Sequence, residues 1–415
     1  MIYDLITIGG GPAGMLASAR AAENGARVLL LEKNNKLGIK LLITGKGRCN
    51  ITNADFDQRS FIDKFGSNGK FLFSAFNKFN NEQIINFFNS RGLEVQVERG
   101  NRVFPVTNKA GDVLNILIDY LKQNKVEIKT NSEVKDIVLK DNKIEKIILK
   151  NGEEFKAEKY LICTGGKSYP LTGSTGDAYA WLEKMGHTII KPTPALVPII
   201  CEQNFIKDLE GLSLKNVNIS IFQNNKKVDS RFGEAIFTAN GLSGPIILDM
   251  SKNISELLNS DKVNLEIDFK PALEFETLDK RIQRDFSEAK NKMFKNSLNQ
   301  LLPQKLIPIV IKLSQINPDK QVNSITKEER KKLLHLLKNF SLDIKKIDGF
   351  NKAIITSGGV DLHEVDPKTM QSKIIDNLYL AGEVLNLDGP TGGYNLQVCW
   401  STAYSVAENF KQFNP

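Results

Sequence analysis

The stretch YDLITIGGGPAG, residues 3–14, decides the fold, because an apolar run leads directly into a glycine cluster. The pattern predicts a strand over 3–8, a helix over 13–24 and a second strand over 27–31 that is closed by Glu32. A strand, a glycine turn and a helix, with an acidic residue about 20 positions further on, are typical of dinucleotide-binding folds. The start of the chain therefore predicts a nucleotide site.

Each glycine of this turn meets a different physical need. Gly9 permits the tight turn off the strand, Gly11 lets the backbone approach a pyrophosphate, and Gly14 lets the helix pack closely on the sheet. Amide groups at the helix start then face the phosphates with the positive end of the helix dipole. Glu32 is placed to accept hydrogen bonds from a ribose hydroxyl pair.

Size and composition narrow the class of protein. At 415 residues the chain exceeds one ordinary core, so two or three domains are expected. No apolar run approaches the roughly 20 residues of a membrane span, and no basic segment precedes the first strand, so we expect a cytoplasmic protein without a membrane partner. The cysteines at 49, 163, 201 and 399 are scattered, which argues against a disulfide framework or a metal site.

The formal net charge of +8 allows two interpretations. Lysine and arginine are spread along the chain and crowd only at Lys327–Lys332, where an amphipathic helix explains them. This spread favours solvated faces over a nucleic-acid partner. We therefore expect a small-molecule substrate, and the sequence leaves the oligomeric state open.

The texture of the chain changes after residue 190 and again after 275 and 350. Strands and helices alternate at first, and segments of alternating hydrophobicity, typical of strands, then dominate. A basic pattern with helical periodicity follows from 278 to 350, and strands followed by glycine-rich turns then return. We predict an α/β, Rossmann-like nucleotide-binding domain formed discontinuously by 1–190 and 351–415. A β-rich domain over 191–275 and a helical domain over 276–350 are inserted into it.

Further clusters of glycine and polar residues extend the predicted site. They cover 44–53, 163–166, 381–383 and 389–396. Two of them follow buried strands, and ligands of open α/β sheets lie outside the carboxyl ends of strands. The last cluster opens a helix, whose amides could stabilise negative charge on a bound ring.

One cofactor is consistent with all of these clusters. It needs a pyrophosphate site, a ribose acceptor, a strand exit near a ribityl chain and a helix start that balances an electron-accepting ring. That cofactor is FAD. Its ring would carry the redox chemistry, while the protein positions the ring and excludes water.

Together the motifs resemble a known family, the bacterial flavoproteins of the YhiN/BaiN type, which includes aminoacetone-oxidase-like proteins. The family belongs to the two-dinucleotide-binding-fold group of flavoenzymes. The matching segments are 8–14 with Glu32, 45–53, 102–105, 163–166, 172–177, 241–245, 356–360 and 382–396. The resemblance implies a glutathione-reductase type of FAD-binding domain with an inserted β domain and a helical domain.

The resemblance also implies non-covalent FAD and the residues that hold it. Lys33 and the backbone of Val134 would lie near the adenine, and Lys40 beside the ribityl chain and flavin. The implied cofactor-binding residues are Gly9, Gly11, Pro12, Ala13, Gly14, Glu32, Lys33, Lys40, Thr44, Gly45, Gly47, Arg48, Cys49, Asn50, Val134, Thr164, Gly165, Gly166, Gly382, Glu383, Gly392, Gly393, Tyr394, Asn395 and Leu396.

The leading functional hypothesis is hydride transfer between flavin N5 and a small organic substrate, as an NAD(P)H-linked reduction of an activated C=C bond. No second GxGxxG motif follows a strand, so either NAD(P)H docks transiently on the flavin face or another electron donor serves. The alternatives are a flavin-dependent amine oxidase and a tRNA- or nucleic-acid-associated flavoprotein.

A catalytic acid or base is not evident. Arg48, which could favour an anionic ring, and Tyr394, which could donate a proton, are the weak candidates, whereas Cys49 is expected to be a small buried residue.

Overall fold

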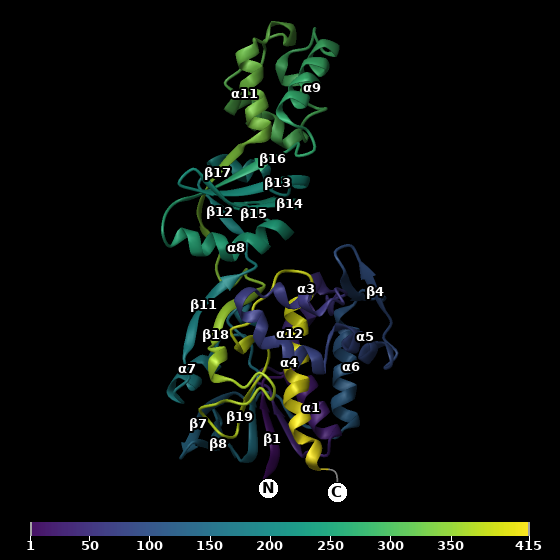
Figure 1. Cartoon of the computed structure of the whole chain (residues 1–415), viewed down its shortest axis with the longest axis vertical. Coiled ribbons are helices and arrows are strands. Elements are labelled where there is room, and N and C mark those ends of the chain that lie inside the picture. The colour runs from purple at the N-terminus through teal and green to yellow at the C-terminus, as the bar shows by residue number, and fades with distance from the viewer. Residues whose placement is uncertain (1, 414–415) are drawn as a thin grey trace. The chain divides into compact units, whose positions relative to one another are not determined.

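The computed structural model describes residues 2–413 and divides into two compact units (Figure 1). The larger unit is formed by 1–195 and 350–415, and the smaller unit by 196–349. Each unit has its own cluster of buried hydrophobic side chains. The chain therefore builds the larger unit from both of its ends.

A five-stranded parallel sheet forms the centre of the larger unit. In spatial order its strands are β19 (Leu378–Leu380), β10 (Ala157–Ile162), β1 (Tyr3–Ile8), β2 (Val28–Leu31) and β6 (Glu127–Lys129). The register pairs Ile8 with both Ile162 and Leu31, and Ile162 with Leu380. Because these pairs align the carboxyl ends of four neighbouring strands, the turns that follow them lie at one edge of the sheet.

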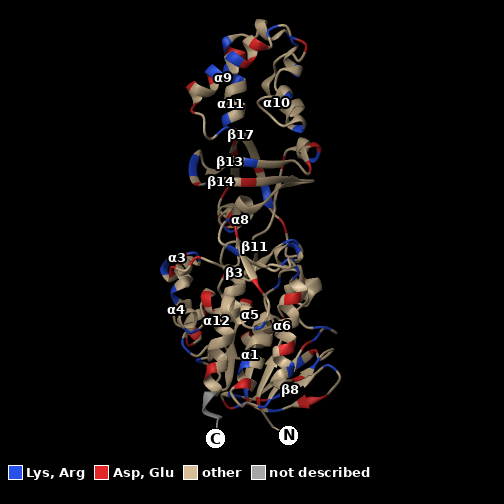
Figure 2. Ribbon diagram, turned by 90° about the vertical axis from the view of Figure 1, so that its right-hand side faces the viewer, with Lys and Arg blue, Asp and Glu red and all other residues tan. Residues whose placement is uncertain are grey.

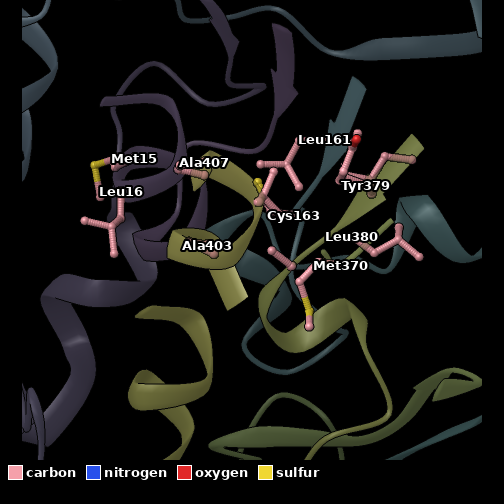
Figure 3. Packing of buried hydrophobic residues seen from close by; sticks show 14 of the residues in the cluster. Met15, Leu16, Leu161, Cys163, Met370, Tyr379, Leu380, Ala403 and Ala407 are labelled. Carbon is pink, nitrogen blue, oxygen red and sulfur yellow. The ribbon is translucent and has the colours of Figure 1, made fainter. Parts of the chain in front are cut away.

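Helices α1 (Pro12–Glu23) and α12 (Tyr394–Ala407) pack against each other beside this sheet (Figure 1). Figure 3 shows Met15 and Leu16 of α1 in the same buried cluster as the small residues Ala403 and Ala407 of α12. Small side chains let helix backbones approach closely, so the low side-chain bulk of α1 has a packing function. The contact joins the first and last helices of the chain.

The remaining elements of the larger unit surround this core. The helices are α2 (Ile39–Ile43), α3 (Gln58–Asp63), α4 (Gly69–Lys78), α5 (Asn81–Asn89), α6 (Ala110–Gln123) and α7 (Asp177–Lys184). The strands are β3 (Thr52–Asn53), β4 (Val95–Glu98), β5 (Arg102–Pro105), β7 (Val134–Lys140), β8 (Lys143–Leu149), β9 (Glu154–Phe155), β11 (Ile189–Ala195) and β18 (Ile355–Val360). They form the small sheets β3-β5-β4, β7-β8-β9 and β11-β18.

The smaller unit contains a closed six-stranded barrel and four α-helices. The barrel order is β12 (Ile199–Cys201), β15 (Gly241–Ser243), β14 (Lys226–Thr238), β13 (Ser213–Gln223), β16 (Val263–Asp268) and β17 (Phe340–Ile347). The helices are α8 (Pro245–Leu258), α9 (Phe275–Glu288), α10 (Ile307–Ser314) and α11 (Lys327–Lys338). Barrel and helices share one buried core.

The predicted helical pattern over 278–350 is wrong at its end, where 340–347 is strand β17. Buried and exposed residues alternate from Phe340 to Lys345, which is the period of a strand. β17 pairs with β16 on one side and β12 on the other and so closes the barrel. Helix α8 likewise interrupts a stretch in which alternating strands were expected, because Gly244 and Pro245 start a helix there.

Two further properties concern the surface and the helices. Lys and Arg are interspersed with Asp and Glu in both units, so neither unit carries a charge of a single sign (Figure 2). Among the described residues, no helix combines the length and the apolar character that crossing a bilayer requires.

Candidate functional site

Four of the predicted turns lie next to one another because their strands are neighbours in the sheet. Gly9 follows β1, Thr164–Gly166 follow β10, Gly382–Glu383 follow β19, and Glu32 follows β2. The second and third of these segments lie far from the first in sequence. The parallel sheet brings them to one crevice at its carboxyl edge, where ligands of such folds bind.

Two glycines of the first turn, Gly9 and Gly14, are sterically required. Gly9 has φ +110°, and a Cβ there would lie 2.7 Å from the carbonyl oxygen of Cys163. A Cβ on Gly14 would overlap the carbonyl oxygen of Gly9. A Cβ on Gly11 would have no neighbour within 4 Å, so Gly11 faces open space. No side chain caps the start of α1 at Gly11, which leaves its amides available to an anion.

A small cleft of about 40 Å³, partly open to solvent, lies beside this turn. Five of the predicted cofactor residues line it, namely Gly9, Glu32, Lys33, Val134 and Thr164. Ser132, Gly173, Asp177 and Trp181 also line the cleft and were not among the predicted residues. Asp177 ends the 172–177 motif, so the sequence contained a motif that could have identified this residue as part of the site. Trp181 lies on α7 and carried no motif.

Glu32 is held in place by hydrogen bonds and is 8% exposed. Its Oε2 accepts from the amide of Gly10 at 2.7 Å, and its Oε1 accepts from Asn34 N at 2.8 Å and Asn34 Nδ2 at 2.7 Å. Lys33 Nζ, which also lines the cleft, bonds Asp177 Oδ2 and Thr175 Oγ1 at 2.5 Å each. The carboxylate thus connects the glycine turn to the second strand.

A second carboxylate, Glu383, is the centre of a polar network at the end of β19. Its Oε2 lies 2.7 Å from Lys40 Nζ, and its Oε1 accepts from Ser168 Oγ at 2.9 Å and from Thr356 N at 2.8 Å. Lys40 Nζ also donates to Ser168 Oγ at 2.6 Å. Both side chains of the ion pair are about one-fifth exposed, 22% for Lys40 and 18% for Glu383. Sequence reasoning found Lys40 and Glu383 but missed Ser168 and Thr356, whose partners are distant in sequence.

The loop that follows α2 has an unusual backbone. Gly45, Lys46, Gly47 and Cys49 all have positive φ, at +56°, +59°, +84° and +61°. Lys46 and Cys49 pay a conformational cost there that glycine does not. Strain of this kind persists only where the surrounding structure holds the segment, which marks the loop as a candidate ligand contact.

Cys49 is fully buried within this loop. Burial raises the pKa of its thiol to about 12, and a hydrogen bond with Thr44 only partly opposes this. The thiol is therefore protonated at neutral pH and unsuited to act as a nucleophile. This agrees with the expectation of a small buried residue.

Arg48 extends from the loop toward the β4–β5 hairpin. Its guanidinium forms an ion pair with Glu98, its Nε donates to Asn108 Oδ1 at 2.7 Å, and its Cζ lies 4.0 Å from the ring centre of Phe104. The hydrogen bond from Arg48 lowers the pKa of the Glu98 carboxyl. The side chain predicted to carry charge near the ring is thus bound to a neighbouring hairpin.

The start of α12 is joined to the same loop. Gly393 has φ +102°, and a Cβ there would overlap the backbone of Thr52. Asn53 Nδ2 donates to Gly392 O at 3.0 Å, and Thr52 Oγ1 donates to Gln397 Oε1 at 2.7 Å. The helix start has no side-chain cap, so its amides resemble those of α1 in being open to a ligand.

The side chains of the next three residues are used in packing and loop closure. The Tyr394 ring is buried, with its centre 4.7 Å from that of Phe61. The Asn395 amide bonds the backbone of Gly389 in both directions, at 2.8 and 2.9 Å. Leu396 packs against the hydrophobic core. Tyr394, a candidate proton donor in the sequence, therefore lies in an aromatic cluster.

These features provide a test of whether a flavin dinucleotide fits. Among the described residues, Thr164 Oγ1 and Asn50 Oδ1 are buried and have no hydrogen-bond partner. One lies at the end of β10 and the other in the loop beside α12. Buried polar atoms are normally paired, so both are suited to a bound group. Together with the open face of Gly11 and the uncapped helix starts, they fit a pyrophosphate with a polar ring.

The described residues contain no cluster of three or more His, Cys, Asp or Glu side chains that could hold a metal ion. The polar groups at the crevice are those of a nucleotide site: amides, hydroxyls, an amide side chain and two carboxylates. Such groups can bind phosphates and sugar hydroxyls.

Comparison with known proteins extends this picture. The sequence model of the HI0933-like protein Rossmann domain matches residues 3–409. A 3-dehydro-bile acid delta(4,6)-reductase of Clostridium scindens is 31% identical over 400 residues, which are 96% of each chain. The ribosomal RNA dihydrouridine synthase of Escherichia coli is 30% identical over 414 residues, 98% of each chain.

Solved structures share the fold at low sequence identity. A 3-ketosteroid delta1-dehydrogenase from Sterolibacterium denitrificans aligns over 100% of both chains with a TM-score of 0.55 and 14% identity. A flavocytochrome c3 fumarate reductase aligns over 99% of this chain and 78% of its own, with a TM-score of 0.52 and 14% identity. These similarities concern the fold alone, and they confirm the predicted fold class.

Proposed function

Because the chain belongs to the HI0933-like family of Rossmann-domain proteins, we propose that it reduces a carbon–carbon double bond conjugated to a carbonyl group. It does so as an FAD-dependent oxidoreductase. The observation that carries the proposal is the crevice formed by four turns at adjacent strand ends, with Glu32 and Glu383 at two of them. When bound, FAD supplies a hydride from N5 of its reduced ring.

Different residues of the crevice bind different parts of FAD. The amides at the start of α1 hold the pyrophosphate, and Glu32 accepts hydrogen bonds from the adenosine ribose. Glu383, oriented by Lys40 and Ser168, serves the ribityl chain. The start of α12, at Gly393, stabilises negative charge on the ring. The uncapped helix starts support these roles.

The names of the two full-length relatives support the substrate chemistry. A 3-dehydro-bile acid with delta-4 and delta-6 double bonds has a C=C bond conjugated to a ketone. Dihydrouridine is formed by adding hydrogen to a uracil C=C bond that is conjugated to a carbonyl. Both reactions add a hydride and a proton to an activated alkene. We therefore assign the same class of reaction to this chain, with a small organic enone as substrate and NAD(P)H as a transient donor.

Uridine in RNA is the second candidate substrate. The specific observation in its favour is the identity of 30% to a ribosomal RNA dihydrouridine synthase across 98% of both chains. The net charge of +8 is compatible with a polyanion. The chemistry at the flavin would be unchanged, and only the group presented to it would differ.

A reduction screen under nitrogen separates these possibilities. The purified protein should be yellow, and NADH or NADPH should bleach it in a stopped-flow measurement. Reoxidation by 3-oxo steroids with 4,6 double bonds supports the first candidate, and reoxidation by uridine-containing RNA supports the second. Bleaching by amines in place of nicotinamides would contradict the proposal and favour an amine oxidase. A colourless protein that added FAD does not restore would contradict it outright.

A further inference from the structure

A second cleft lies at the other end of helix α1, bounded by α1, α5, α6 and α12. Its cavity volume is about 330 Å³, partly open to solvent, which is at the lower end of the range of roughly 300–1,000 Å³ that small-molecule sites occupy. Two arginines and four aromatic residues line it, namely Arg20, Phe79, Phe87, Arg91, Tyr120 and Tyr404. Arg20 is eight residues beyond Pro12, about 12 Å along the helix axis from the proposed pyrophosphate site.

Arg20 is neutralised within this cleft. It forms ion pairs with Glu23 and with Glu408, the latter at 3.2 Å, and it contacts Tyr404 Oη at 3.5 Å. Burial alone would raise the pKa of Glu23, but hydrogen bonds from Tyr120 and Arg20 outweigh it and lower the pKa. Glu23 is therefore ionised at neutral pH, and Arg20 has two carboxylate partners. Arg20 joins α1 to the end of α12 and is not available to a ligand.

Arg91 differs because it forms no ion pair with a carboxylate, although its charge contributes to lowering the pKa of Glu23, which lines the same cleft. Its Cζ lies 3.9 Å from the ring centre of Phe87 and 4.5 Å from that of Tyr120. Its Nη1 donates to Phe87 O at 3.3 Å, with Ser90 Oγ at 3.5 Å. Within residues 2–413 the guanidinium forms no ion pair, although two rings and a carbonyl fix its orientation. An oriented, unpaired guanidinium is a recognition group for phosphate or carboxylate.

The other walls carry aromatic rings and polar edges. Phe87 and Tyr404 are partly exposed there, whereas Phe79 and Tyr120 are buried. The Phe79 and Tyr404 rings are stacked with centres 4.4 Å apart and an interplanar angle of 9°. Gln83, Asn86 and Ser90 line the cleft from one face of α5 and its end, at helical spacing. Nucleobases stack on such rings and on guanidinium planes, and amide and hydroxyl side chains bond their edges.

We propose that this cleft binds a nucleotide, with the phosphate on Arg91 and the base against the aromatic walls. The nucleotide is either free or part of an RNA strand, since both present the same phosphate and base. The site is separate from the FAD crevice, and the proposal does not depend on the proposed reduction.

The test uses the FAD-loaded protein, so that the crevice at the start of α1 is already filled. Calorimetric titration with UMP, AMP and uridine measures binding of the free form, and fluorescence anisotropy with a labelled oligouridylate measures binding of the strand. We expect UMP to bind more tightly than uridine. Arg91→Ala should weaken binding about tenfold or more, and Arg91→Lys should restore only part of it, because lysine lacks the planar fork. Arg59→Ala, an exposed arginine on α3, is the matched control and should bind as the wild type does.

Asn86→Trp provides a second variant, since this exposed side chain can fill the mouth of the cleft without disturbing the core. It should abolish binding while FAD content and bleaching by NAD(P)H stay unchanged, which separates this site from the proposed function. Loss of oligouridylate binding alone in the variants identifies RNA as the source, and loss of UMP or AMP binding identifies a free nucleotide. Absence of all binding to the wild type, or equal binding by wild type, Arg91→Ala and Asn86→Trp, overturns the proposal.

Discussion

At the scale of single residues, the local sequence predicts where glycine is needed, whereas the position of a charged side chain is set by partners that lie elsewhere in the sequence. Gly9 and Gly14 have no room for a Cβ, and this follows from the tight strand–turn–helix sequence itself. Arg48 was expected beside the ring, yet its guanidinium lies on Glu98 and Phe104. The partner is 50 positions away, and nothing in the loop sequence indicated it.

Gly14→Ala should remove bound FAD and destabilise the fold by about 2 kcal/mol or more, because the added methyl overlaps Gly9 O. Gly111→Ala in α6 is the matched control, since a Cβ there meets nothing within 4 Å. It should stabilise by about 0.5–1 kcal/mol. Urea unfolding and visible flavin absorbance measure both variants. Wild-type FAD content in Gly14→Ala would contradict the assigned role of this turn.

Arg48→Ala should weaken FAD retention or slow flavin reduction by several-fold. The structure suggests that Arg48 acts by anchoring the strained loop to Glu98, and Glu98→Gln tests this. If the anchor matters, both variants should show the same defect in flavin dissociation and in stopped-flow reduction. If Arg48 acts through its charge on the ring, only Arg48→Ala should be impaired. Unchanged FAD content and kinetics in both would refute a role for this pair.

At the scale of elements, the ends of strands and helices determine the site. Glu383 follows β19, Lys40 lies on α2, and Ser168 and Thr356 come from segments almost 190 residues apart. A second buried network joins α7 and β11 to the segment around residue 370. His187 Nδ1 lies 3.1 Å from Glu364 Oε2, and its Nε2 lies 2.9 Å from Ser372 Oγ.

The His187 network should make stability depend on pH. Burial lowers the pKa of His187, and the bond and charge of Glu364 only partly offset this. Ser372 Oγ accepts hydrogen bonds from the backbone amides of Ile374 and Ile375. Its hydroxyl hydrogen is therefore directed to His187 Nε2, which must be unprotonated to accept it. Below a pH of about 6.5, the unfolded chain therefore binds a proton more readily than the folded chain. Stability should fall as pH falls from there through the lowered pKa.

The melting temperature measured at pH 8 and pH 5.5 checks this. The decrease on acidification should be roughly 2 °C smaller in His187→Asn than in the wild type. His335→Asn, at an exposed position of α11, should follow the wild type. Equal decreases in the wild type and His187→Asn would show that this histidine does not set the acid sensitivity.

At the scale of the whole molecule, the two units have separate hydrophobic cores. The larger unit contains every element of the proposed FAD crevice, and β11 and β18 pair so that Ala195 lies opposite Ile355. The ends of the inserted segment are thus already close. The larger unit has the parts it needs to fold around FAD by itself.

Replacing residues 196–349 by a short glycine–serine linker should therefore leave a soluble, yellow protein. Its FAD dissociation constant should stay within about tenfold of the wild type, while turnover of any enone or RNA substrate found in the screen should be lost. Equilibrium dialysis and the anaerobic assay measure these two properties. Failure to retain FAD in a folded variant would show that the insertion contributes to the cofactor site.

The sequence by itself determined the first strand, the glycine turn, the first helix, the fold class and the family resemblance, which the comparison confirmed. These rest on local causes: hydrophobic periodicity and positions where only glycine fits. Only the tertiary structure decided which strand ends meet and that β17 closes the barrel. It also decided that Ser168 and Thr356 donate hydrogen bonds to Glu383 and that the Ser168 amide donates to Thr356 Oγ1. Contacts between distant segments depend on how whole elements pack, and no short stretch of sequence records that packing.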